Sequence, residues 1–103
     1  MFRHVVMMRW APDATGAQKA AVRAGLEDLP GRIPEIRSYS LGTDARVNEG
    51  NFDFVVVADF DDVEGYLVYR DHPDHRAVIQ EHIRPILADR AAVQHDLSGG
   101  AFA

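Results

Sequence analysis

Histidine is the residue type through which this 103-residue chain could carry out acid–base chemistry. The chain has five histidines and no cysteine. An imidazole titrates near neutral pH, so it can take a proton from a substrate or return one. The lack of cysteine excludes disulfides, thiolate metal ligands and a cysteine nucleophile from this chain. Any catalysis would therefore use imidazole and phenol groups.

The densest cluster of such residues is the run Tyr69-Arg70-Asp71-His72-Pro73-Asp74-His75. Pro73 cannot continue a helix but can begin one, so this run lies at the junction of two helical segments. His75 either faces a pocket or is a satisfied core or surface histidine. His72 either caps the second segment or faces the pocket. Tyr69 either packs in the core or offers its hydroxyl to a ligand.

His4 is the third candidate, because it stands on a strand face whose other residues are apolar. These neighbours are Phe2, Val6 and Met8, which share its side of the strand by two-residue alternation. His4 is either a core histidine bonded to the backbone or a pocket group. A neutral imidazole has one donor and one acceptor, and could orient a carbonyl or hydroxyl.

The sequence predicts neither a metal site nor a cofactor. The His-x-x-His spacing of His72 and His75 is common by chance. His75 and His82 lie about 10 Å apart along a helix, too far to bind one ion together. A metal site would therefore need further ligands. There is no glycine-rich phosphate loop, no G-x-S-x-G elbow and no Rossmann fingerprint.

Seven elements must position these residues. Strands are predicted over residues 2–10, 36–42, 52–60 and 90–97. Helices are predicted from residue 13 or 15 to residue 29, over residues 63–70, and from about residue 74 to residue 87. Pro73 interrupts the last helical region. The order β-α-β-β-α-β predicts an α+β protein of the ferredoxin-like class, with a four-stranded antiparallel sheet and both helical layers on one face.

Length and composition indicate one small globular domain. Hydrophobic residues make up 47% and charged residues 26% of the chain, as in ordinary globular proteins. We expect one domain over residues 1–97 and a flexible tail over residues 98–103. The net charge of −5 argues against a nucleic-acid or anionic-membrane binder. No apolar run is long enough to span a membrane, and no signal peptide is visible. We therefore expect a cytoplasmic protein.

The face of the sheet opposite the helices is predicted to be apolar and uncovered. Val5, Met7, Val55 and Val57 point to that face. An exposed apolar area of this size requires a partner. A second copy related by a twofold axis is the simplest one, so we expect a homodimer that joins two sheets into one barrel.

The space between the helices and the sheet is predicted to hold an apolar pocket. Its apolar lining would be Val22, Leu26, Phe54, Val56 and Ile79. Its polar groups would be Tyr69, His4 and His75. His75 belongs to a helical stripe, with Ile79, His82 and Ile86, that is predicted to face the sheet. Such a pocket suits a small hydrophobic or aromatic molecule. A histidine base and a tyrosine donor there could support proton abstraction, cyclisation or isomerisation without a cofactor.

Four segments together resemble the stress-responsive A/B barrel family, also called Dabb. They are residues 2–6, Ile33-Pro34, residues 52–57 and Tyr69-x-x-His72-Pro73-x-His75. The resemblance implies a dimeric α+β barrel. Members include plant stress-induced proteins, a plant polyketide cyclase and many bacterial proteins without an assigned reaction.

The resemblance also implies roles for three residues. By similarity to the cyclase, His75 would be the general base, with Tyr69 and His4 in the same pocket. Phe54 and Leu26 stand where the cyclase has a second strand histidine and a pocket tyrosine. The pocket here would therefore be more apolar.

Three functions follow as hypotheses. The first is a cofactor-independent cyclase, isomerase or lyase that acts on a small aromatic or polyketide-like compound. The second is a non-catalytic dimer that binds a ligand during stress, in which the histidines only satisfy hydrogen bonds. The third is a dimeric-barrel monooxygenase, for which Trp10 and the histidines are the only support.

Overall fold

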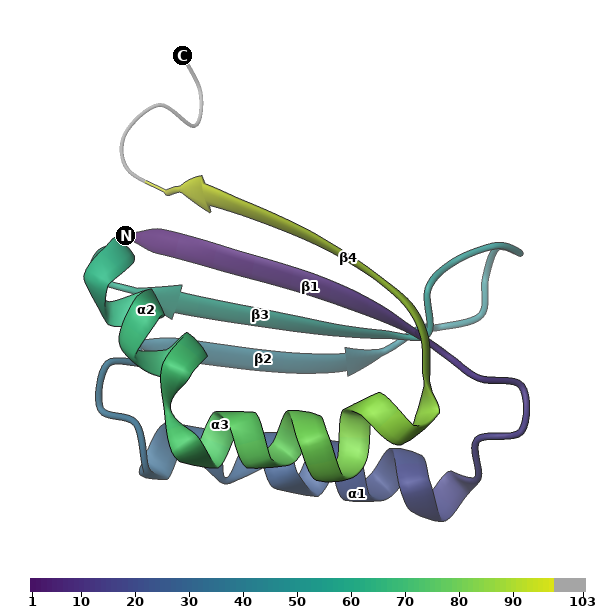
Figure 1. The fold of residues 1–103 in the computed structure, drawn as a ribbon. Helices are drawn as coiled ribbons and strands as arrows, with labels where there is room; N and C mark the ends of the chain where they lie inside the picture. Colours follow the sequence, from purple (N-terminus) through teal and green to yellow (C-terminus); the bar gives the residue numbers. More distant parts are fainter. Residues whose placement is uncertain (98–103) are drawn as a thin grey trace.

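The computed structural model describes residues 1–97 of the chain (Figure 1). The predicted flexible tail, residues 98–103, lies outside the described residues. The strands are β1 (Phe2–Trp10), β2 (Ser38–Thr43), β3 (Phe54–Phe60) and β4 (Leu87–Asp96). The helices are α1 (Gly16–Glu27), α2 (Val63–Asp71) and α3 (Pro73–Val78), with short turns η1 (Leu29–Gly31), η2 (Ile79–Ile83) and η3 (Arg84–Ile86).

The four strands form one antiparallel sheet in the order β2-β3-β1-β4. The helices lie together on one face of this sheet, and β4 forms the edge that they cover least (Figure 1). This arrangement confirms the predicted ferredoxin-like fold. Within residues 1–97, no helix is both long and apolar enough to cross a membrane.

Local signals in the sequence fix the start of α1 and α2. The Thr15 hydroxyl accepts a hydrogen bond from the backbone N–H of Gln18, and the Gln18 side-chain oxygen accepts one from the backbone N–H of Thr15. This capping box satisfies two helix-end donors. Asp62 caps α2 through the N–H of Gly65.

The helical region after Pro73 differs from the prediction in its buried face. A continuous helix would bury His75, Ile79, His82 and Ile86 in one stripe. The chain instead forms a π-helical turn at η2, which inserts extra residues per turn. The buried residues are therefore Val78, Ile83 and Ile86, and the predicted stripe is wrong at His82, which lies close to Gly25 of α1.

The core lies between the helices and the sheet. Its most deeply buried large side chains are Phe60, Leu26, Leu29, Ile33, Val22 and Val56. The buried polar residues are His4, which is 6% exposed, and Asp59, which is 5% exposed. Arg3 donates two hydrogen bonds to the Asp59 carboxylate at 2.8 and 2.9 Å, and this pair holds the pKa of Asp59 below its usual value.

Candidate functional site

A cavity of about 400 Å³ lies between the helical layer and strands β1 and β4. His4, Tyr69 and His75 all line it, as do the apolar residues Leu26, Val56 and Ile79. These six residues come from six different elements and from positions up to 75 residues apart in the chain. The fold therefore gathers most of the side chains that the sequence singles out around one space.

His75 lies in the first turn of α3, where it is half-buried. Its Nδ1 is 3.1 Å from the backbone oxygen of Arg70. A carbonyl oxygen can only accept, so Nδ1 carries the proton and the neutral ring keeps a free lone pair on Nε2. Burial lowers the pKa of His75 from its ordinary value. The neutral form, which can act as a base, is thus favoured at neutral pH.

His4 has the opposite arrangement of its ring nitrogens. The amide nitrogen of Gln94, on the neighbouring strand β4, lies 3.0 Å from Nδ1 of His4. An amide nitrogen donates, so Nδ1 accepts and the proton of the neutral ring is on Nε2. Burial, together with the smaller effects of Arg90 and His75, lowers the pKa of His4 to about 4. His4 is therefore a neutral hydrogen-bond donor.

Two tyrosines contribute to the cavity in different ways. The Tyr69 ring lies 4.1 Å from the His75 ring, centroid to centroid, and its hydroxyl shares a 2.8 Å hydrogen bond with that of Tyr39. Burial raises the pKa of Tyr69, so it stays protonated. Tyr66 also lines the cavity, with its ring 4.9 Å from that of His4. Tyr69 thus fixes the His75 ring, while Tyr66 extends the polar lining.

Three residues predicted for the pocket lie elsewhere. His72 caps α3, because its Nδ1 accepts a 3.1 Å hydrogen bond from the backbone N–H of Asp74. Val22 is fully buried in the core. Phe54 packs against Trp10 at 5.9 Å between ring centroids. None of the three lines the cavity that holds His4 and His75.

Several lining residues were missed by the sequence reasoning. They are Tyr66, Arg70, Ile83, Arg84 and Arg90, with Gln94 behind His4. Arg90 and Gln94 could have been found from strand alternation, because they lie opposite Met8 and His4 on the helix-facing side of β4. Ile83 could not, since the π-helical turn alters the helical period.

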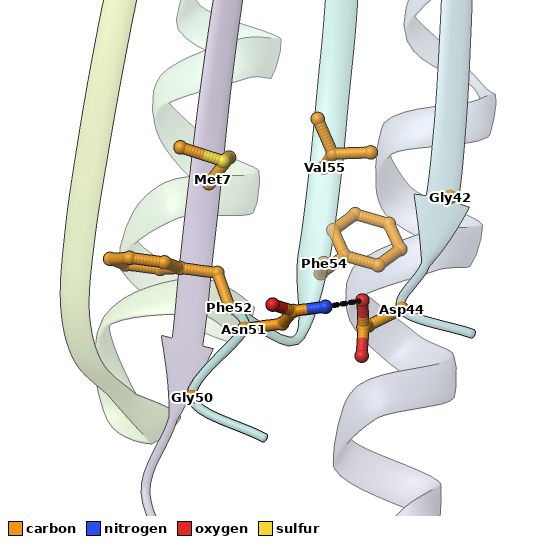
Figure 2. A pocket seen from close by; sticks show the side chains of 8 residues that line it. All are labelled: Met7, Gly42, Asp44, Gly50, Asn51, Phe52, Phe54 and Val55. Atoms are coloured by element: carbon orange, nitrogen blue, oxygen red, sulfur yellow. Dashed lines mark hydrogen bonds between the residues drawn. The ribbon is translucent and has the colours of Figure 1, made fainter. Parts of the chain in front are cut away.

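A second hollow of about 380 Å³ lies at one end of the opposite sheet face. Figure 2 shows Met7 and Val55 on adjacent strands there, with Phe52 and the loop that contains Asn51 below them. The Asn51 amide donates to Asp44 at 3.1 Å. No histidine lines this hollow. Across residues 1–97, no group of three His, Cys, Asp or Glu residues is arranged to hold a metal ion.

The sequence as a whole matches one family model. The model, described as the stress responsive A/B barrel domain, matches residues 2–96. The chain belongs to the stress responsive A/B barrel family. A Dabb family protein from Mesorhizobium loti, described as having a ferredoxin-like fold, is 17% identical, with a TM-score of 0.79 over 95% of this chain and 97% of that one. A comparison with curated proteins gives no match.

Solved structures share this fold at very different levels of sequence identity. A dimeric ferredoxin-like protein of unknown function from Thermobifida fusca is 46% identical, with a TM-score of 0.86 over 93% of this chain and 90% of that one. A hydroxynitrile lyase from Passiflora edulis is 19% identical, with a TM-score of 0.80 over 91% and 90%. An antibiotic biosynthesis monooxygenase is 16% identical, with a TM-score of 0.78 over 96% and 100%. The last two share the fold only.

Proposed function

We propose that the cavity binds a small apolar molecule and that His75 acts on it as a general base without a cofactor. The observation that supports this proposal is the pair of complementary histidines on one cavity. Nε2 of His75 has a free lone pair and Nε2 of His4 has a proton, as their partners Arg70 and Gln94 require. A base and a donor are what proton abstraction beside a carbonyl requires.

In this proposal each polar residue has a separate task. His75 takes a proton from carbon or oxygen, and His4 donates a hydrogen bond to the substrate oxygen on which charge develops. Tyr69 positions the His75 ring through their contact, since its hydroxyl already pairs with Tyr39. Tyr66 lines the cavity and is placed to offer a second hydroxyl. Cyclisation, isomerisation and lyase reactions all begin with such a proton transfer.

Deuterium exchange tests the base directly, because it needs no knowledge of the natural substrate. Wild-type protein is incubated with 4-phenyl-2-butanone in D₂O, and NMR follows deuterium entry at the carbons beside the ketone. We expect exchange above the buffer rate, and a loss of about 100-fold in that enhancement for His75→Ala. His82→Ala is the matched control, because His82 does not line the cavity. Wild-type exchange in His75→Ala would contradict the proposal.

A non-catalytic ligand-binding protein is the second candidate, and one observation favours it. No buried side-chain nitrogen or oxygen in the described part of the chain lacks a hydrogen-bond partner. His4 and Tyr69 could thus be purely structural polar groups. This candidate predicts that wild-type protein binds 4-phenyl-2-butanone but gives no exchange above buffer. The monooxygenase hypothesis has less support, because Trp10 is buried against Phe54 and does not line the cavity.

We also propose that the chain forms a homodimer through the open sheet face. Val5 pairs with Val57 and Val93 in the middle of this face, and Met7 pairs with Val55 and Ala91. Val93 is 61% exposed in the single chain, an unfavourable position for valine unless a partner covers it. The dimeric relative from Thermobifida fusca supports the same assembly. A cytoplasmic location is consistent with the absence of cysteine.

Sedimentation of two matched valine variants tests the interface. Val57→Asp places a charge in the apolar centre of the open face and should convert dimer to monomer. Val68→Asp adds the same charge at an exposed position of α2 and should leave the dimer intact. A dimeric Val57→Asp protein would exclude this face as the interface.

A further inference from the structure

The charged residues that line the cavity all have the same sign. Arg70, Arg84 and Arg90 line it together with the two histidines, whereas no Asp or Glu does. The chain as a whole has 16 Asp and Glu against 11 Lys and Arg. The cavity lining, with three cations and no carboxylate, is therefore positively charged in a protein whose net charge is negative.

Internal ion pairing accounts for one of these arginines only. Arg70 donates to both carboxylate oxygens of Asp71, at 2.9 and 3.1 Å. Within the described residues, Arg84 and Arg90 form no ion pair. Asp89 is adjacent to Arg90 in sequence but points to the other face of β4, opposite Arg9. Two guanidinium groups thus remain available to a ligand.

The two free arginines lie at the solvent end of the cavity. Both are exposed, while the deeper lining is apolar and includes Val6, Leu26 and Ile83. Between Arg90 and Gln94, β4 presents only the small side chain of Ala92 to this side. A ligand could therefore place an apolar body between the helices and the sheet and an anionic group at the arginines.

We propose that the ligand of this cavity is a small apolar molecule with a terminal oxyanion, a carboxylate or a phosphate, bound by Arg84 and Arg90. The planar guanidinium group can donate two parallel hydrogen bonds to either anion. This assignment rests on the proposed function, whose substrate class it narrows to anionic compounds. It also makes Arg84 and Arg90 binding residues, separate from the histidines that would carry out the chemistry.

Calorimetric titration with three probes of similar shape tests the assignment. The probes are 3-phenylpropionate, its uncharged amide 3-phenylpropanamide, and 2-phenylethyl phosphate. We expect wild-type protein to bind at least one anionic probe about tenfold or more tightly than the amide. The probe that binds more tightly tells a carboxylate ligand from a phosphate ligand.

Arginine variants then connect the preference to the two side chains. The double variant Arg84→Gln with Arg90→Gln should bind the amide as wild type does, which shows that it is folded, and should prefer anions less than twofold. The control variant Arg23→Gln removes a guanidinium group from the outer surface of α1. It should prefer the anionic probes over the amide as strongly as wild type does.

Two results would overturn the assignment. If wild-type protein binds the amide as tightly as both anions, or if the double variant keeps its preference, the arginines do not select the ligand. The proposed function would survive either result, since its test uses a neutral ketone and His75. If none of the three probes binds, the anion assignment is wrong, and the exchange test with the neutral ketone decides the proposed function separately.

Discussion

Replacing His4 by glutamine should reduce the loss of stability of this protein in mild acid. His4 is buried, accepts from Gln94 and has a pKa of about 4, compared with 6.5 for an unperturbed histidine. Between these two values the unfolded chain binds a proton that the folded chain does not bind. The free energy of unfolding must therefore fall as the pH falls from about 6.5 to about 4.

The size of the effect follows from the two pKa values. At pH 7 the imidazole is largely neutral in both states, so it contributes little. At pH 5 it is almost fully protonated in the unfolded chain and mostly neutral in the folded one. The linkage relation then gives a loss of about 2 kcal/mol between pH 7 and pH 5 from His4 alone. His75, whose pKa is also lowered, adds a loss of the same sign.

Urea unfolding at pH 7 and pH 5, at one fixed protein concentration, measures this loss. The decrease in unfolding free energy should be smaller by about 2 kcal/mol in His4→Gln than in wild type. His95→Gln removes an exposed histidine of β4 and should leave the decrease within about 0.5 kcal/mol of wild type. If wild type and His4→Gln lose equal stability, His4 is not held neutral by the fold, and its role as a neutral donor fails.

Three further predictions concern side chains that surround the cavity histidines or support their neighbours. Arg90→Gln removes a charge that disfavours the protonated form of His4, so NMR titration of the His4 ring should show a higher pKa than in wild type. Tyr39→Phe leaves the buried hydroxyl of Tyr69 without its partner, and should lower the free energy of unfolding by about 1–2 kcal/mol. Tyr66→Phe removes a hydroxyl that makes no hydrogen bond within the described residues. This variant should change the free energy of unfolding by less than about 0.5 kcal/mol.

The order of elements was predictable because hydrophobic alternation in the strands is strong and turn residues separate them. β3 shows the limit of this reasoning. Its apolar pattern begins at Phe52, whereas the strand begins at Phe54. The Asp53 carboxylate, just before the strand, accepts hydrogen bonds from the backbone N–H of Trp10 and from Arg46. Such side-chain contacts depend on distant residues, and local periodicity cannot reveal them.

The candidate site was predictable where a residue is tied to a local motif. His75 follows Pro73 at a helix start, and His4 stands on an apolar strand face, so both were assigned to the cavity region. Arg84 and Arg90 were not assigned to the cavity from the sequence. Arg84 lies in a short turn after the π-helical segment, and Arg90 lies on an edge strand. Charged residues at such positions are ordinarily exposed to solvent, and only the three-dimensional arrangement brings them to one space.

The alternation of β4 has a consequence for how ligand binding and assembly affect each other. Arg90, Ala92 and Gln94 face the cavity side, while Ala91 and Val93 face the open side of the sheet. In the proposed dimer a second copy covers that open side, so one edge strand would contact the ligand and the partner chain through successive residues. A ligand that shifts this strand must then alter the dimerisation constant, and by reciprocity dimerisation must alter ligand affinity by the same factor. Titrations at different protein concentrations would measure this coupling.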